Sequence, residues 1–142
     1  MKPLKPIILD ANILLRGVFG IRVYQLLESH NEAILFQAPD ICFRDAARNI
    51  PLIANQRDLN PEKGLQVLDQ IAKIVEVVDQ GIYEIHETRA RARISVREPD
   101  DWPIVATALL LNAPIWTQDQ DFFGCGIATW TTDRVQIYLR DE

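Results

Sequence analysis

Aspartate residues stand beside apolar segments at three separate points of the chain. Asp10 ends one apolar segment, Asp101 begins a second, and Asp119 follows a third. Core packing does not explain an aspartate at the end of a buried strand. Carboxylates that are brought together repel one another unless they are protonated or bridged by a cation. Magnesium is the usual bridging ion, and phosphodiester chemistry is the commonest use of such a site. The pattern therefore predicts a magnesium site in an otherwise apolar framework.

Short apolar strands alternate with helices along the sequence. The expected strands span residues 6–10, 33–36, 113–117 and 127–130. Helical patterns cover residues 21–27, 38–50, 60–75, 83–95 and 101–111, and residues 75–78 suit either a strand or a helix. Asp10 or Asn12 can cap a further helical turn after the first strand. The alternation predicts an α/β fold, a three-layer α/β/α domain with a central parallel sheet, formed by residues 1–142 as a single domain.

The predicted topology gathers the acids at one edge of the sheet. In parallel α/β sheets, sites form outside the carboxyl ends of the strands, and Asp10 and Asp119 both follow strands. Asp101 begins a helix, where backbone N–H groups favour a negative side chain. Taken alone, Asp101 and Asp40 are most simply helix caps, and Asp45 is a surface acid inside a helix. The joint pattern, not any single residue, indicates a site.

Composition and charge narrow the class of protein. The 142 residues are enough for one hydrophobic core, and 48% of them are hydrophobic. No apolar run is long enough to span a bilayer, and Cys42 and Cys125 lack metal-ligand spacing, so we expect a cytoplasmic protein with reduced thiols and no membrane association. The formal net charge of -5 argues against nucleic-acid binding if taken alone. Bound cations, however, cancel the charge of acids concentrated in a metal site.

A basic cluster precedes the acidic segment around Asp101. Arg89, Arg93 and Arg97 fall at positions i, i+4 and i+8, and therefore on one side of the expected helix. This face could hold an RNA backbone. It could equally be a solvated face whose arginines pair with neighbouring glutamates.

Taken in order, the acidic motifs resemble those of the PIN domain family, and the resemblance covers nearly the whole chain. The family opens with a strand that ends in Asp-x-Asn, matched by residues 9–12, and continues with an acid on the helix after the second strand, here Asp45. Its third acid precedes a helix of the form Asp-x-x-x-x-Ala-x-Ala, matched by residues 101–108, and it closes with Thr-x-Asp-x-Asp-Phe, matched by residues 117–122.

The resemblance implies a metal-dependent endoribonuclease, typically the toxin of a VapBC-type toxin–antitoxin pair. The implied catalytic residues are Asp10, Asp45, Asp101 and Asp119. The implied ligands of Mg²⁺ or Mn²⁺ are Asp10, Asp101, Asp119 and Asp121, with Asn12 and Thr117 orienting those carboxylates through hydrogen bonds. The implied partners are an RNA substrate and a small antitoxin protein, and we expect a homodimer.

One departure from the family pattern bears on activity. Asp45 stands where the family usually has Glu, so its carboxylate reaches about one C–C bond, roughly 1.5 Å, less far. The alternative function is therefore a catalytically weakened PIN-like module that binds RNA or protein. Receiver domains and haloacid-dehalogenase-type phosphatases fit less well, because the former need a lysine after the last strand and the latter an Asp-x-Asp after the first.

Overall fold

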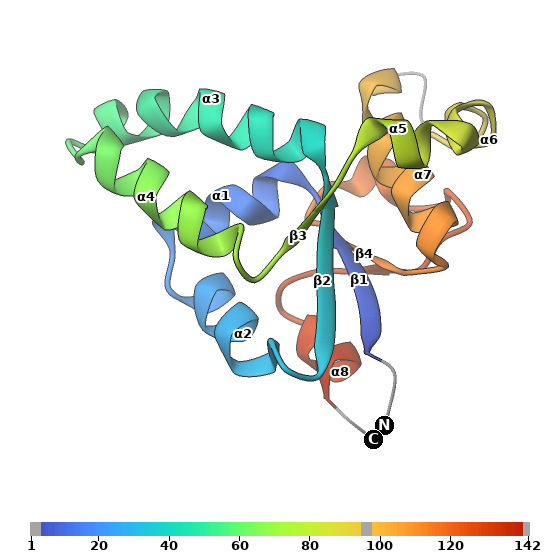
Figure 1. The fold of residues 1–142 in the computed structure, drawn as a ribbon, viewed down its shortest axis with the longest axis horizontal. Coiled ribbons are helices and arrows are strands. Elements are labelled where there is room, and N and C mark those ends of the chain that lie inside the picture. Colours follow the sequence, from blue (N-terminus) through green and yellow to red (C-terminus); the bar gives the residue numbers. More distant parts are fainter. Residues whose placement is uncertain (1–3, 95–97, 141–142) are drawn as a thin grey trace.

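The centre of the fold is a parallel β-sheet that lies between two groups of helices (Figure 1). The computed structural model describes residues 4–94 and 98–140. Within these residues the sheet has five strands in the order β3-β2-β1-β4-β5, and every neighbouring pair is parallel. The strands are β1 (Lys5–Leu9), β2 (Ile34–Pro39), β3 (Glu76–Val78), β4 (Ile115–Trp116) and β5 (Thr129–Trp130). The predicted α/β fold with a central parallel sheet is confirmed.

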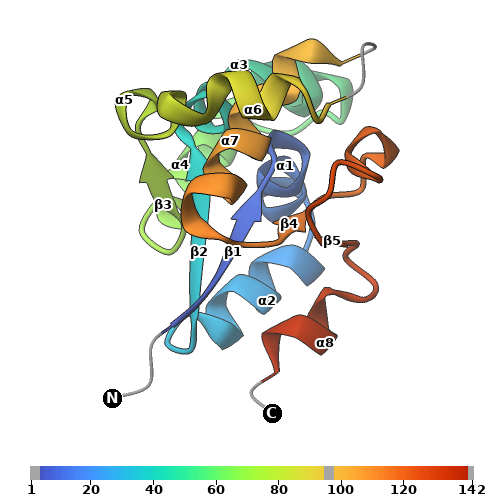
Figure 2. The ribbon, with the colours of Figure 1, turned by 90° about the vertical axis from the view of Figure 1, so that its right-hand side faces the viewer.

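Helices cover both faces of this sheet. The α-helices are α1 (Ala11–Phe19), α2 (Arg22–His30), α3 (Asp40–Gln56), α4 (Pro61–Ile71), α5 (Gln80–Tyr83), α6 (Glu87–Arg91), α7 (Trp102–Leu111) and α8 (Val135–Leu139). Three short 3₁₀ turns are η1 (Glu84–His86), η2 (Pro99–Asp101) and η3 (Gln120–Phe122). Helices α1 to α4 lie on one side of the strands and α5 to α7 on the other (Figure 1), and α7 lies in front of β1 and β2 in Figure 2.

Burial explains why the central elements are apolar throughout. Ile7, Ile8 and Leu9 of β1 are all fully buried, because helices cover both faces of the strand, and a strand in this position needs no polar alternation. Helix α7 is buried at every position from Trp102 to Ala108. It packs against the sheet on one side and against α5 and α6 on the other, so it has no solvent-facing stripe in this half.

Two ambiguous or expected elements differ from the sequence pattern. Helix α4 ends at Ile71, and of residues 75–78 the last three form strand β3. The helical pattern expected over residues 83–95 is found only as far as Arg91, and it is divided: α5, η1 and α6 follow one another. Residue 95 lies outside the described residues. Tyr83 and Ala90 are both buried, and the chain bends between them to keep both against α7, so tertiary packing overrides the local helical pattern.

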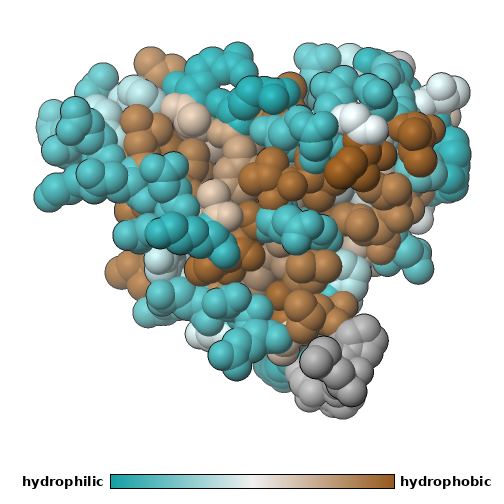
Figure 3. All heavy atoms as spheres, viewed as in Figure 1, coloured by the Kyte–Doolittle hydropathy of each residue, from teal (hydrophilic) through white to brown (hydrophobic). Residues whose placement is uncertain are grey.

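The surface mixes polar and apolar groups. Apolar side chains gather on the face shown in Figure 3. Val77 of β3, Ile82 of α5 and Ile85 of η1 are among the large apolar residues that are exposed. In the described part of the chain, no helix has both the length and the apolar character that crossing a lipid bilayer requires.

Close packing of α3 on α4 makes Gly64 intolerant of a side chain. A Cβ added at Gly64 would lie 2.7 Å from the Cγ2 atom of Ile50, a methyl group on a stiff branched side chain. We predict that Gly64→Ala lowers the free energy of unfolding by about 1–2 kcal/mol, because overpacking outweighs the gain in helix propensity. Chemical denaturation measures the change, with exposed Lys63→Ala on the same helix as control. A Gly64→Ala protein as stable as this control would contradict the packing described.

Candidate active site

Five aspartates from four parts of the chain line one small cavity, which we call the acidic pocket. The cavity has a volume of about 80 Å³. Its acidic lining residues are Asp10, Asp45, Asp100, Asp101 and Asp119. Asp10 follows β1, Asp119 follows β4, and Asp101 ends η2 just before α7. The structure thus brings Asp10, Asp101 and Asp119 together at the carboxyl edge of the sheet, as the topology predicted.

Asp10 is held by hydrogen bonds to two elements. One carboxylate oxygen, Oδ1, accepts from the backbone N–H of Ile13 at 2.9 Å and so caps α1. The other, Oδ2, accepts a short hydrogen bond from the hydroxyl of Thr117. The Thr117 hydroxyl oxygen in turn accepts from the backbone N–H of Asp119 at 2.9 Å. The pKa of Asp10 is raised to about 6, chiefly by burial. The hydrogen bonds from Thr117 and Ile13 oppose this rise, and the charge of Asp119 adds to it.

Asp101 is not a helix cap, which corrects the simplest interpretation of this residue. It occupies the N-cap position of α7, yet its side chain makes no capping hydrogen bond. Burial, and after it the negative charges of Asp119, Glu98, Asp10 and Asp121, raises its pKa from 3.8 to about 7. The carboxylate of Asp101 therefore contributes repulsion to the pocket in place of a cap.

The last two predicted acids lie on η3 or beside it. The Oδ1 atom of Asp119 accepts from the backbone N–H of Asp121 at 2.9 Å, so Asp119 caps this turn while it lines the pocket. Asp121 is partly buried and raises the pKa of Asp101, but the described residues that line the pocket do not include it. Its predicted role as a metal ligand stays a prediction.

Asp45 and Asn12 complete the rim of the pocket. Asp45 lies in the second turn of α3, and its carboxylate forms an ion pair with Arg48 one turn further on. Asn12 is exposed and lines the pocket. Among the residues that the structure describes, its side chain makes no hydrogen bond to an aspartate, so its predicted orienting role is not supported by a contact, whereas Thr117 does contact Asp10.

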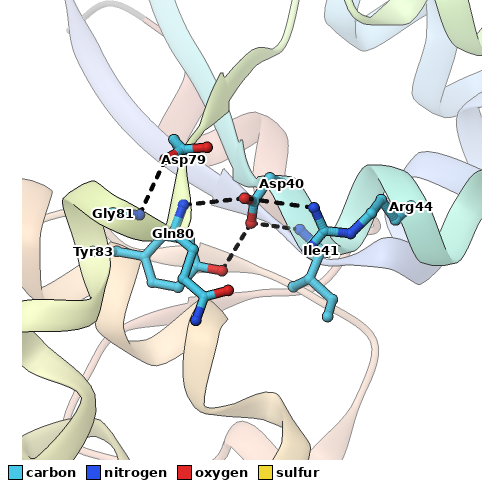
Figure 4. A network of polar contacts seen from close by, with 7 residues as sticks. All are labelled: Asp40, Ile41, Arg44, Asp79, Gln80, Gly81 and Tyr83. Atoms are coloured by element: carbon cyan, nitrogen blue, oxygen red, sulfur yellow. Dashed lines mark hydrogen bonds and ion pairs between the residues drawn. The ribbon is translucent and has the colours of Figure 1, made fainter.

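A hydrogen-bond network fixes the start of α3 against α5 (Figure 4). The Asp40 carboxylate accepts from the backbone N–H groups of Ile41 at 2.8 Å and Gln80 at 3.0 Å, and from the Tyr83 hydroxyl at 2.8 Å. The ring of Tyr83 packs edge-on against Trp102, with centroids 5.6 Å apart. Trp102 directly follows Asp101, so these contacts link the start of α3 to the element that carries Asp101. Asp40, expected only as a cap, is a cross-link between elements.

Sequence reasoning missed one wall residue, Cys42. The residue is buried, lines the pocket and follows Asp40 by two positions on α3. Burial raises its pKa well above 9.0, and the charges of Asp10, Asp45 and Asp101 act in the same direction. The thiol is therefore neutral at physiological pH, and only its place one turn before Asp45 could have marked it.

Comparison with known proteins places the chain in a family. The sequence model of the PIN domain family matches residues 8–140 of the chain. The chain is a member of the PIN domain family. No curated protein sequence matches it closely enough to count as a relative.

Solved structures share this PIN domain fold at low sequence identity. The chain is similar to PAE2754 from Pyrobaculum aerophilum, with a TM-score of 0.69 and 14% identity over 95% of this chain and 89% of that one. It is also similar to VapBC2 from Rickettsia felis bound to a promoter DNA fragment, with a TM-score of 0.63 and 16% identity over 89% and 98% of the two chains. FitAcB from Neisseria gonorrhoeae gives a TM-score of 0.58 and 21% identity over 89% and 97%. At these identities the likeness shows the fold alone.

The donor atoms of this PIN domain suit a hard divalent cation. Within residues 4–94 and 98–140, no three or more His, Cys, Asp or Glu side chains are close enough to form a metal-binding group. Mg²⁺ does not require such a group, because it keeps several waters and often binds through one or two carboxylates. Carboxylates at a shared cavity repel one another and raise one another's pKa, and a bound cation relieves this repulsion. On this ground the residues present fit Mg²⁺ or Mn²⁺.

The predicted basic face lies away from the acidic pocket of this PIN domain. Arg89 and Arg93 line a different cavity, of about 630 Å³, and Arg93 donates to the backbone oxygen of Cys125 at 3.2 Å. Helix α6 ends at Arg91, so the helix does not extend to Arg93, but Arg89 and Arg93 line the same cavity. Their role in RNA binding stays a prediction. Arg97 lies outside the described residues.

The raised pKa of Asp101 predicts a pH dependence of stability without metal. Its folded value of about 7 exceeds the unfolded value near 3.9, so between these values the folded state binds more protons. The free energy of unfolding of the wild type should therefore fall as pH rises from about 4 to about 7. We predict that Asp101→Asn flattens this fall and raises the melting temperature at pH 7.5.

Thermal melts in EDTA across this pH range measure both effects. Asp69→Asn, an exposed aspartate on α4, is the matched control. Parallel curves for the wild type and Asp101→Asn would show that Asp101 does not titrate as described.

Proposed function

We propose that this PIN domain is a metal-dependent endoribonuclease that hydrolyses phosphodiester bonds in RNA. The observation that carries the proposal is the acidic pocket, where aspartates from four parts of the chain are held together despite burial and their mutual repulsion. A fold that serves only stability has no use for this arrangement. PIN domains are generally nucleases, and membership of the family supports the same conclusion.

The residues of the acidic pocket would have different roles in metal binding and in activation of the attacking water. Asp10, Asp101 and Asp119 would hold Mg²⁺ or Mn²⁺, with Asp121 behind them. A bound divalent ion lowers the pKa of its water and neutralises charge that develops on the phosphate. Thr117 keeps one oxygen of Asp10 fixed by its hydrogen bond, so the carboxylate needs little reorganisation when the ion binds. Asp45, on the opposite wall, would orient the attacking water and accept its proton.

The proposed biological role is that of the toxin in a VapBC-type toxin–antitoxin pair, acting in the cytoplasm on RNA. Support comes from fold similarity to the VapBC and FitAB complexes. We propose that a small antitoxin binds the domain and that the domain forms a homodimer, for which exposed Val77, Ile82 and Ile85 offer apolar surface. The neighbouring gene tests the role: a short basic or amphipathic protein encoded there supports it, and its absence favours a solitary nuclease.

A second candidate function is a weakened PIN module that binds without cutting. Asp45 favours it, because this carboxylate is shorter than the usual Glu and is already paired with Arg48. A carboxylate engaged by a guanidinium is a poorer base for water. The two functions differ in whether metal-dependent cleavage occurs at all.

Cleavage by site variants tests the nuclease proposal. With added Mn²⁺, we predict that Asp10→Asn and Asp101→Asn cleave RNA orders of magnitude more slowly than the wild type, because each loses a metal-binding charge. Asp45→Asn should lose less, and Asp45→Glu should match or exceed the wild-type rate. Asn at position 10 retains an N-cap acceptor, so Asp10→Asn should still fold, as circular dichroism will show.

Asp69→Asn serves as the surface control for the cleavage assay. Undiminished cleavage by Asp10→Asn would point to a contaminating nuclease and remove the proposed mechanism. A folded wild type that fails to cleave RNA with either metal would favour the binding module.

Metal binding has a readout that does not depend on activity. Millimolar Mg²⁺ or Mn²⁺ should raise the melting temperature of the wild type near neutral pH, because the ion binds the folded state and relieves carboxylate repulsion. Asp101→Asn should lose most of this shift, and Asp69→Asn should keep it. A wild-type melt that is indifferent to both ions would show that the acidic pocket is not a metal site.

A further inference from the structure

A second cavity adjoins the acidic pocket and carries the opposite charge. It has a volume of about 630 Å³, within the range of ligand-binding clefts. Arg16, Arg22 and Arg57 line it, and we call it the arginine groove. Asn12 and Asp119 line both this groove and the acidic pocket. The two cavities are therefore contiguous, and a ligand that extends from the acidic pocket past Asn12 and Asp119 enters the arginine groove.

One face of α1 forms the floor that leads out of the pocket. Asn12, Leu15, Arg16 and Phe19 all line the groove, and their spacing of i, i+3, i+4 and i+7 places them on one side of the helix. Seven residues of α-helix rise by about 10 Å, which exceeds the axial step of about 3.4 Å per phosphate along one strand of a duplex. The face is long enough to follow a nucleic-acid strand beyond one nucleotide.

The three arginines come from different elements and keep their charges available. Arg16 lies on α1, Arg22 begins α2, and Arg57 follows the end of α3. Among the described residues, none of the three forms a salt bridge. Arg22 donates to the side-chain oxygen of Gln136 at 3.2 Å, and the guanidinium of Arg57 lies over the ring of Phe19 at 5.3 Å. These neutral contacts orient the guanidinium groups of Arg22 and Arg57 without neutralising them. Arg16 has no such contact among the described residues, and its charge lowers the pKa of Asp10.

We infer that the arginine groove binds the backbone of a single RNA strand next to the phosphate held at the acidic pocket. The inference rests on the proposed nuclease function, since a strand cleaved at the acids must continue into a neighbouring cavity. Guanidinium groups bind phosphate oxygens through paired hydrogen bonds. Apolar Leu15, Phe19 and Ile53, which also line the groove, offer surface for bases, and this combination suits strands with little sequence preference.

The net negative charge of the chain means that RNA can bind only where arginines gather locally. The chain has a net charge of -5, so long-range attraction does not bring RNA to its surface as a whole. A polyanion needs local cations, and the groove places three beside the cleavage site. The basic residues first considered, Arg89 and Arg93, line a cavity that shares no described residue with the acidic pocket, and so they do not contact the same stretch of strand there.

Salt-dependent binding tests the inference. The assay uses Asp101→Asn protein, which should not cleave, and a fluorescein-labelled single-stranded RNA, with anisotropy measured in fixed Mg²⁺ over a range of KCl concentrations. Removing one phosphate contact from a single strand lowers the slope of log K against log [salt] by about 0.7. Arg22→Gln and Arg57→Gln should each lower the slope by this amount and weaken binding by about tenfold, and the double variant should lower it by about 1.4. Lys73→Gln, which removes the same charge outside all three cavities, should leave slope and affinity unchanged.

Cleavage assays separate this inference from the proposed function. In the background with Asp101 intact, the Arg22→Gln and Arg57→Gln proteins should show a raised KM with kcat largely retained. Suppose that the wild type cleaves RNA with metal, but the Arg22→Gln and Arg57→Gln proteins bind RNA as well as Lys73→Gln does. This result would overturn the inference that the arginine groove binds RNA, and the nuclease proposal would remain. Arginine-dependent RNA binding by a wild type that cannot cleave would overturn the nuclease and support the groove. Polyglutamate that binds in place of RNA, with the same dependence on arginine, would overturn it in favour of an acidic peptide.

Discussion

The burial and mutual repulsion of carboxylates at the edge of the sheet are the constraint on which the rest of this structure depends. Asp10 and Asp101 share a pocket in which burial and neighbouring charge favour their protonated forms. Without a cation, ionising them near neutral pH costs stability. The rest of the fold must supply the free energy that keeps the acids together, and in return the pocket is preorganised for a cation.

The framework meets this cost with rigid, well-buried elements. β1 is fully buried at Ile7, Ile8 and Leu9 and ends at Asp10. α7 is enclosed on all sides over its first two turns and begins at the residue after Asp101. The Asp40–Tyr83 hydrogen bond and the Tyr83–Trp102 ring contact connect these elements through α3 and α5. Each acid thus stands at the end of an element whose position is already fixed by apolar packing.

The sequence was informative where one local pattern determines one outcome. A continuous apolar run predicted β1, and the position of Asp10 and Asp119 after strands predicted their meeting at one edge. The division of residues 80–91 into three short elements could not be predicted, because contacts with α7 from distant sequence determine it. The arginine groove also has no local signal, since Arg16, Arg22 and Arg57 converge from three helices. The missing cap at Asp101 shows the same limit: an aspartate before a helix gives the same sequence pattern whether or not it caps.

The neutral thiol of Cys42 has a consequence for which metals the acidic pocket favours. Soft ions such as Zn²⁺ bind sulfur as thiolate, and they must displace its proton to do so. Burial, and after it the charges of three neighbouring aspartates, makes that proton costly to remove. The sulfur is therefore a poor ligand although it lines the pocket. An ion entering this pocket meets carboxylate oxygen and water, the ligands that Mg²⁺ and Mn²⁺ prefer. In the proposed metal site, discrimination against zinc would then come from Cys42, a residue that binds no metal.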